Sequence, residues 1–162
     1  MGFVGLFAGA LLGTALMTLL TEVGQGLHLS RMSLPFVLGT MFTERRKAVW
    51  TLGWLSHFAI GLGFALPYGF LFLLLGHATW WIGALAGTVH GFVVLTVVFP
   101  LLQEVHPRMA TYDQGPDPTP LLQPPGFLGL NYGVQTPVLT VAAHVLYGAI
   151  LAVFYQSFVS FP

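Results

Sequence analysis

The chain has 162 residues, of which 56% are hydrophobic and only 6% are charged. Soluble domains carry roughly 25% charged residues, so this composition predicts a protein whose solvent is lipid. The formal net charge is zero, which excludes the basic footprint of a nucleic-acid-binding protein. The absence of cysteine excludes disulfides, thiolate metal sites and cysteine nucleophiles. At this length, one domain covering residues 1–162 is expected.

Four apolar stretches are long enough to cross a bilayer, which takes about 20 residues per helix. They predict an all-α integral membrane bundle of four transmembrane helices. The stretches run from about Gly2 to Gly26, from Val49 to Leu75, from Thr79 to Leu102 and from Thr136 to Phe158. Only residues 76–78 separate the second from the third, which predicts a tight antiparallel hairpin. We expect the first stretch to be a retained helix, because it lacks the positive leading region of a signal peptide.

Two segments, residues 28–48 and 104–135, are not expected to span. The first contains the apolar stretch 33–39, which is too short to cross and is expected to lie at the membrane interface. The second is rich in proline, and its leading part is therefore expected to be an extended loop. Its prolines are Pro107, Pro116, Pro118, Pro120, Pro124 and Pro125.

All five basic residues fall in or beside these two segments. They are Arg31, Arg45, Arg46, Lys47 and Arg108. Since cytoplasmic loops of membrane proteins are enriched in Lys and Arg, both loops are predicted to be cytoplasmic and both termini outside.

Repeated spacings predict that the chain is a tandem of two helix pairs, residues 1–77 and 78–162. The second span has His, Gly and Ala at positions 57, 61 and 65, and the fourth has the same residues at 144, 148 and 152. Each half contains an even number of spans, so the symmetry axis would run along the membrane normal. Coincidence is the alternative, because glycine is abundant in this chain.

Glycines recur at every fourth position in the spans. They are Gly5, Gly9, Gly13, Gly61, Gly83, Gly87, Gly91 and Gly148. Small residues at this spacing allow helix backbones to approach closely in a membrane. They indicate packing within this chain, docking onto a helix of a partner, or room for a flat cofactor. Prolines at positions 67 and 100 are expected to kink the second and third spans.

Three intramembrane histidines, His57, His90 and His144, are candidate cofactor ligands, because ionisable groups inside spans are costly and are often functional. One hypothesis is a haem or (bacterio)chlorophyll site, with Gly61 and Gly148 leaving space for the macrocycle. The alternative is a set of neutral histidines that form hydrogen bonds across the bundle. The expected partners are a backbone carbonyl, Thr14, Thr18, Thr88 or Tyr147.

A second polar cluster is expected near the cytoplasmic ends of the helices. Its members are Glu22, Gln25, His28, Gln103, Glu104 and His106. Carboxylates and histidines together could form a metal or proton site, although the Glu-x-x-His spacing of di-iron bundles is absent. The other interpretation is that these residues close the helix ends and pair with Arg31 or Arg108. The chain has no hydrolase, zinc-protease or nucleotide-binding motif, so it is not predicted to be an enzyme.

Several short motifs carry a resemblance that covers most of the chain. They are Ala8-Gly9, Met17-Thr18-Leu19, Leu38-Gly39, His57-Phe58-x-x-Gly61, His106-Pro107-Arg108-Met109, Pro125-Gly126-Phe127-Leu128-Gly129 and His144-x-x-Tyr147-Gly148. In these motifs the chain resembles small bacterial integral membrane proteins with four spans, grouped as a domain of unknown function. The resemblance implies a multi-pass protein of the bacterial inner (cytoplasmic) membrane, and it assigns no activity or site.

Three functions are compatible with these patterns. The favoured hypothesis is a non-catalytic accessory or assembly subunit of a larger membrane complex, whose partners are the lipid bilayer and other membrane subunits. The second is a haem- or pigment-binding electron-transfer protein that uses the intramembrane histidines. The third is a small oligomeric transporter or channel lined by Glu22, Glu104 and the histidines. No role with nucleic acid is expected.

Overall fold

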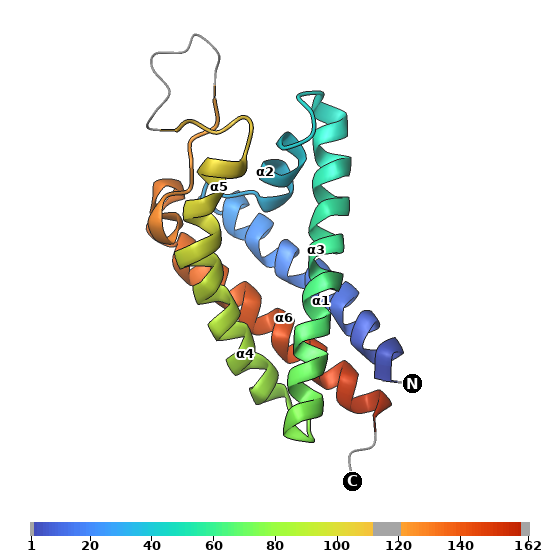
Figure 1. Cartoon of the computed structure of the whole chain (residues 1–162). Coiled ribbons are helices and arrows are strands. Elements are labelled where there is room, and N and C mark those ends of the chain that lie inside the picture. The colour runs from blue at the N-terminus through green and yellow to red at the C-terminus, as the bar shows by residue number, and fades with distance from the viewer. Residues whose placement is uncertain (1, 112–120, 160–162) are drawn as a thin grey trace.

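The computed structural model describes residues 2–111 and 121–159, and within these ranges all regular elements are helices. Four helical stretches are long and apolar enough to cross a membrane, which confirms the predicted four-span architecture. They are α1 (Gly2–Gly26), α3 (Arg46–Leu75), the composite span Trp80–Val105 and α6 (Thr136–Phe158) (Figure 1). The composite span consists of α4 (Trp80–Val93), the π-helical segment η1 (Val94–Val98) and α5 (Phe99–Val105). It ends three residues beyond the predicted boundary, and α3 begins three residues earlier than predicted.

The predicted hairpin between the second and third spans is present. Gly76 stops α3 by adopting a left-handed conformation with φ of 69°, and its N–H binds the Leu73 carbonyl. Glycine adopts this conformation without steric cost, which is why it commonly follows the last turn of a helix. Thr79 then precedes α4, so only a few residues reverse the chain.

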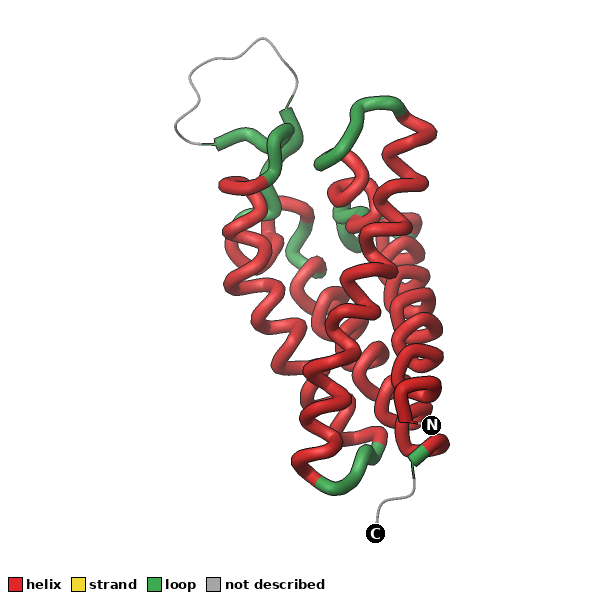
Figure 2. The backbone as a smooth tube through the Cα atoms, turned by 45° about the vertical axis from the view of Figure 1, so that its right-hand side comes forward, coloured by secondary structure: helices red, strands yellow, loops and turns green. Residues whose placement is uncertain are grey.

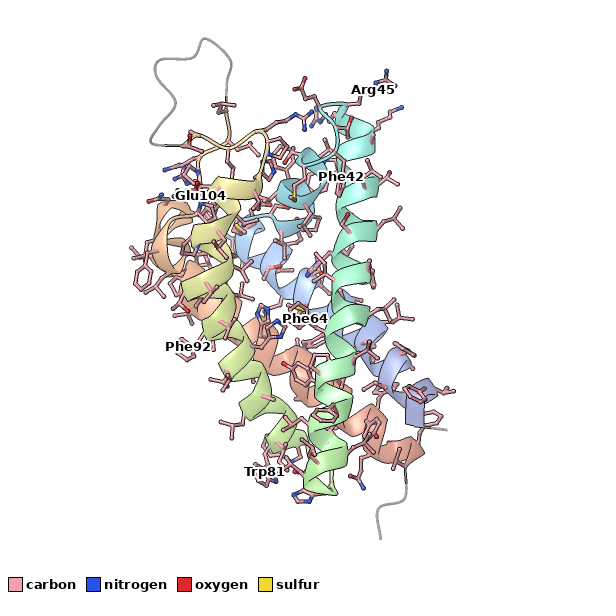
Figure 3. All side chains as sticks on the ribbon, viewed as in Figure 1. Phe42, Arg45, Phe64, Trp81, Phe92 and Glu104 are labelled. Carbon is pink, nitrogen blue, oxygen red and sulfur yellow. The ribbon has the colours of Figure 1, made fainter. Side chains whose placement is uncertain are left out.

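The two ends of the described chain lie together, at the end of the bundle opposite the long loops. A Cβ on Gly2 would lie 2.9 Å from the Val159 side chain, so α1 starts where α6 finishes. Arg45 and Glu104 mark the other end, and Trp81 lies at the same end as the chain termini (Figure 3). We call these the loop end and the terminal end. The five basic residues therefore gather at one end, as the predicted topology requires.

The spans are not packed evenly around a common axis. Helix α6 lies along both α1 and α4, whereas α3 packs on α1 and on the short helix α2 (Leu34–Thr40). Helices α3 and α4 converge at the Gly76 turn and diverge towards the loop end (Figures 1 and 2). Both halves share the order long helix, short helix, long helix. However, α1 and α6 lie together along their length, and the counterpart pair α4 and α3 does not, so the tandem repeat stays a prediction.

The glycine stripes are used inside this chain. Gly83 and Gly148 face each other so closely that a Cβ on either would overlap the carbonyl oxygen of the other. A Cβ on Gly87 would overlap the His144 carbonyl, and one on Gly9 would lie 2.8 Å from Phe154. Close backbone contact supplies the dispersion energy that holds helices together in lipid, where burial of apolar surface gives no gain. The stripes on α1 and α4 therefore form the two faces that hold α6.

Helix α2 folds back against α3. Ser33 caps it by accepting a hydrogen bond from the Phe36 N–H, and a proline occupies its first turn. A Cβ on Gly53 of α3 would overlap the Pro35 carbonyl, and one on Gly39 of α2 would overlap the Val49 carbonyl. The segment predicted to lie at the interface is thus largely buried against a span.

The chain leaving α5 ties α2 in place. The His106 Nδ1 accepts a hydrogen bond from the Arg108 N–H (3.1 Å), so its Nε2–H donates to the Val37 carbonyl (3.0 Å). Arg108 donates to the Thr40 carbonyl (2.7 Å) and forms an ion pair with Glu44 (3.0 Å). Arg108 thus satisfies the Thr40 carbonyl, which α2 itself leaves unpaired, and His106 adds a second donor to the Val37 carbonyl, which also accepts from the Thr40 hydroxyl.

Replacing Arg108 with alanine is expected to loosen α2, because the last carbonyls of this short helix lose a charged donor. Such a bond contributes about 1 kcal/mol when partly exposed, so amide exchange in residues 34–44 should accelerate about fivefold. Hydrogen–deuterium exchange in nanodiscs measures this rate. Arg46→Ala is the control, because this exposed residue makes no such contact, and equal exchange in both variants would contradict the tether.

The proline-rich segment is described only in part. Pro116, Pro118 and Pro120 lie outside the described residues. On either side, Met109 and Leu122 form an isolated bridge, as an extended loop would. The segment η2 (Phe127–Tyr132) then forms 3-10 turns interrupted by a kink, where Leu128 and Gly129 have positive φ angles of 58° and 71°. Burial raises the pKa of Tyr132 in this segment, and the nearby Arg31 guanidinium opposes the increase.

Candidate functional site

A pocket lies between the diverging helices α3 and α4. It contains about 690 Å³ of space not filled by protein, including the space at its mouth. Ile60 and Phe64 of α3 and Val98 of η1 form its exposed rim, and Phe64 projects between the helices (Figure 3). Since the rim belongs to membrane-spanning segments, the pocket opens sideways towards lipid. A second, smaller cavity adjoins it, and the two share His57, His144 and four apolar residues.

The three candidate histidines meet at this pocket, although each comes from a different helix. His57 of α3, His90 of α4 and His144 of α6 all line it. His57 is only 5% exposed and His144 only 7%. The His90 and His144 rings meet edge to face, with centroids 4.6 Å apart. The rest of the lining is almost wholly apolar.

The Nδ1 of His144 donates its hydrogen to the protein. This atom lies 2.7 Å from the Thr140 carbonyl oxygen, and a carbonyl can only accept. A neutral imidazole carries one N–H, so the Nε2 of His144 holds a lone pair. His144 thus binds a backbone carbonyl of its own helix, four residues back, and not one across the bundle as the sequence predicted.

The same reasoning applies to His57. The hydroxyl of Thr18 donates its only hydrogen to the Thr14 carbonyl (2.6 Å). It must therefore accept from the His57 Nδ1, 3.0 Å away, which confirms Thr18 as a predicted partner. In the neutral ring, the Nε2 of His57 is again left as an acceptor. Within residues 2–111 and 121–159, neither of the two Nε2 atoms has a hydrogen-bond partner.

Three aromatic residues lie around the histidines: Phe64 and Tyr147 line the pocket, and Tyr68 contacts His90. The sequence patterns singled out Tyr147 but not Phe64 or Tyr68. The Tyr68 hydroxyl lies 3.3 Å from the His90 Nδ1, and the Phe64 and His90 rings pack in a tilted arrangement with centroids 4.2 Å apart. Tyr147 donates a hydrogen bond to the Gly61 carbonyl (2.6 Å). One signal could have identified Tyr68, because it follows His57 by about three helical turns and so shares its face.

The π-helical segment η1 forms part of the pocket wall through Val94 and Val98. At its end, the Phe99 N–H binds the carbonyl five residues back, at Val94. Pro100 follows directly and cannot donate, so the distortion expected from this proline takes the form of a widened turn. Segments of this kind occur often at functional sites.

Neighbouring helices take up the space into which a Cβ of Gly61 or Gly148 would project. A Cβ on Gly61 would overlap the Thr14 hydroxyl, and one on Gly148 would overlap the Gly83 carbonyl. In that direction the two glycines accommodate neighbouring helices, although Gly61 also lines the pocket. The haem or chlorophyll hypothesis stays a prediction. No group of three or more histidine or acidic residues in the described part of the chain could hold a metal ion.

The polar residues expected to cluster near the loop end are dispersed, because each has a different partner. Glu22 accepts from the Ser33 hydroxyl (2.7 Å), Glu104 accepts from its neighbour Gln103 (3.1 Å), and His106 is tied to α2. Neither Glu22 nor Glu104 pairs with an arginine, since Arg31 binds the Asn131 carbonyl and Gln123, and Arg108 binds Glu44. The expected contacts with these arginines are made by Gln25, which donates to the Arg31 carbonyl (3.3 Å), and by His106, which accepts from the Arg108 N–H (3.1 Å).

Comparison with protein families, with curated proteins and with solved structures finds no match to this chain. The structure and hydropathy therefore describe a multi-pass membrane protein with four spans, and the pocket is the feature from which its function must be argued.

Proposed function

We propose that this chain is a non-catalytic protein of the bacterial inner membrane that binds a small lipid-soluble ligand in the three-histidine pocket. The observation that carries the proposal is the convergence of His57, His90 and His144 from three helices on one cavity. Burying three imidazoles in a bilayer is costly, and such residues usually serve binding or transport. A mainly apolar cavity with a few convergent polar groups is the usual form of a small-molecule site.

The shape of the pocket supports a ligand that arrives from the bilayer. Its rim side chains Ile60, Phe64 and Val98 are exposed between 38% and 43%. A lipid-soluble molecule could therefore enter between α3 and α4 without crossing the polar loops. Helix α2 closes the loop end of the pocket with Leu34 and Leu38.

The test compares a variant that fills the pocket with one that adds the same bulk outside it. The protein is purified from its native membrane in mild detergent, and its bound small molecules are identified by mass spectrometry. A visible absorption spectrum of the same sample detects a pigment. We expect the wild-type protein to carry one small molecule in a near-equal molar amount. This molecule should be lost in Val94→Phe and retained in Val97→Phe. Val94 lines the pocket, whereas Val97 of the same segment is exposed outside it.

A ligand content that is equal in both variants would contradict the proposal. So would the absence of any stoichiometric molecule from the wild type, combined with failure of added apolar probes to bind. Correct folding of both variants is checked by their elution as single species in gel filtration.

The accessory-subunit hypothesis now lacks one of its motivations, because the small-residue stripes that could dock a partner hold α6 instead. It predicts that the protein co-purifies with other membrane subunits. Migration as a stable monomer in mild detergent would count against it. The transporter hypothesis loses its expected path, because Glu22 and Glu104 do not line the pocket.

A further inference from the structure

We infer that the pocket selects a lipid-soluble ligand that donates a hydrogen bond, such as an alkylated phenol, over the analogue that can only accept one. This inference rests on the proposed function and names the chemistry of its ligand. It follows from the hydrogen-bond roles of His57 and His144, and from the nature of the remaining pocket lining.

The hydrogen-bond partners of His57 and His144 determine which ring nitrogen donates. His144 must donate from Nδ1, because its partner is the Thr140 carbonyl. His57 must also donate from Nδ1, because the hydrogen of its partner, the Thr18 hydroxyl, is already given to the Thr14 carbonyl. Two of the three imidazoles therefore offer lone pairs, not N–H groups, at their remaining nitrogen.

The imidazole rings of the pocket stay neutral. The pocket lining contains no carboxylate, and His57, His90 and His144 are its only titratable groups besides Tyr147. An imidazolium here would bury an unpaired charge next to two other histidines. Protonating Nε2 would also turn both acceptors into donors, so the neutral state fixes what the site can recognise.

A ligand that donates a hydrogen bond complements the lone pairs of His57 and His144. A hydroxyl or N–H of a ligand can donate to either Nε2 lone pair, whereas an ether or carbonyl oxygen placed there would meet another acceptor. A buried acceptor without a donor carries a penalty that exceeds the gain from an ordinary hydrogen bond. Sites that present buried polar groups therefore discriminate strongly against analogues that lack the matching group.

The lining favours an apolar ring for the rest of the ligand. Phe64, Phe99 and Tyr147 border the cavity, together with aliphatic residues of α2, α3 and η1. Aromatic rings pack well against such neighbours in offset or edge-to-face arrangements. A phenol with a short alkyl chain combines this ring with a single hydrogen-bond donor.

The experiment measures binding of 4-hexylphenol and of its methyl ether, 4-hexylanisole, to the protein in lipid nanodiscs. Equilibrium dialysis against empty nanodiscs of the same lipid corrects for partition into the bilayer. We expect the phenol to bind about tenfold more tightly than the ether, as one hydrogen bond in a dry site requires. In the double variant His57→Leu/His144→Leu the two affinities should differ by less than about twofold.

Equal affinities of the two probes for the wild-type protein would overturn the inference while leaving the proposed function intact. Binding of neither probe above the level of empty nanodiscs would overturn both. Comparison of the two probes on the wild type decides the question even where the double variant does not fold. Val94→Phe serves as the blocked-pocket control and should weaken both probes.

Discussion

Replacing Gly148 with alanine is expected to destabilise the protein by about 3 kcal/mol, because a methyl group has no space between α4 and α6. The added Cβ would overlap the backbone carbonyl oxygen of Gly83, and neither atom belongs to a flexible side chain that could move aside. The helices would have to separate, and the contact on which the α4–α6 pair depends would be lost. Unfolding by SDS in mixed micelles, followed by near-UV circular dichroism, measures the change.

Gly63→Ala is the matched control for this substitution. Gly63 also lies within a membrane span, but a Cβ there would meet no atom within 4 Å. Alanine favours a helix by up to about 1 kcal/mol over glycine, so this variant should be neutral or slightly more stable. Unfolding of both variants at the same SDS fraction would contradict the close contact between the α4 and α6 backbones.

Replacing Tyr147 with alanine is the second substitution expected to have a large effect. Tyr147 is only 1% exposed, its ring packs edge to face on Tyr68 at 5.5 Å, and its hydroxyl binds the Gly61 carbonyl. Removing a buried aromatic ring leaves a cavity and costs about 3–5 kcal/mol in soluble proteins. We expect a loss of about 3 kcal/mol here, because the unfolded state in lipid also keeps apolar side chains out of water.

Tyr147→Phe separates the hydroxyl from the ring. This variant keeps the packing and loses one interhelical hydrogen bond, which in membrane proteins is worth about 0.6 kcal/mol on average. Val138→Ala on α6 is the control for side-chain truncation, because Val138 is 70% exposed. The same SDS titration should therefore rank the variants Val138→Ala, Tyr147→Phe and Tyr147→Ala in order of increasing destabilisation. A different order would contradict the central position of this ring.

The sequence by itself determined the class and the spans of this protein. Hydropathy identifies each transmembrane stretch because a bilayer of fixed thickness demands a minimum apolar length. The α1 and α6 boundaries agree with those predicted, and Gly76 ends α3 because only a left-handed turn allows so short a hairpin. The five basic residues also lie at one end of the bundle, as expected if they are excluded from lipid.

Only the tertiary structure decided which faces of the helices meet. Every span is apolar on most sides, so periodicity does not reveal the buried face as it does in a soluble helix. Sequence spacing indicated that Gly61 and Gly148 lie on closely packed faces. It did not show that Thr14 and Gly83 fill the space beside them. It likewise identified three histidines without showing that they share a pocket, because α6 must first be placed between α1 and α4. Hydrogen-bond partners such as Thr18 and Thr140 then fix which histidine nitrogen donates. A hydrogen bond requires that donor and acceptor lie within about 3 Å of each other, and only the packing of the helices determines which atoms come that close.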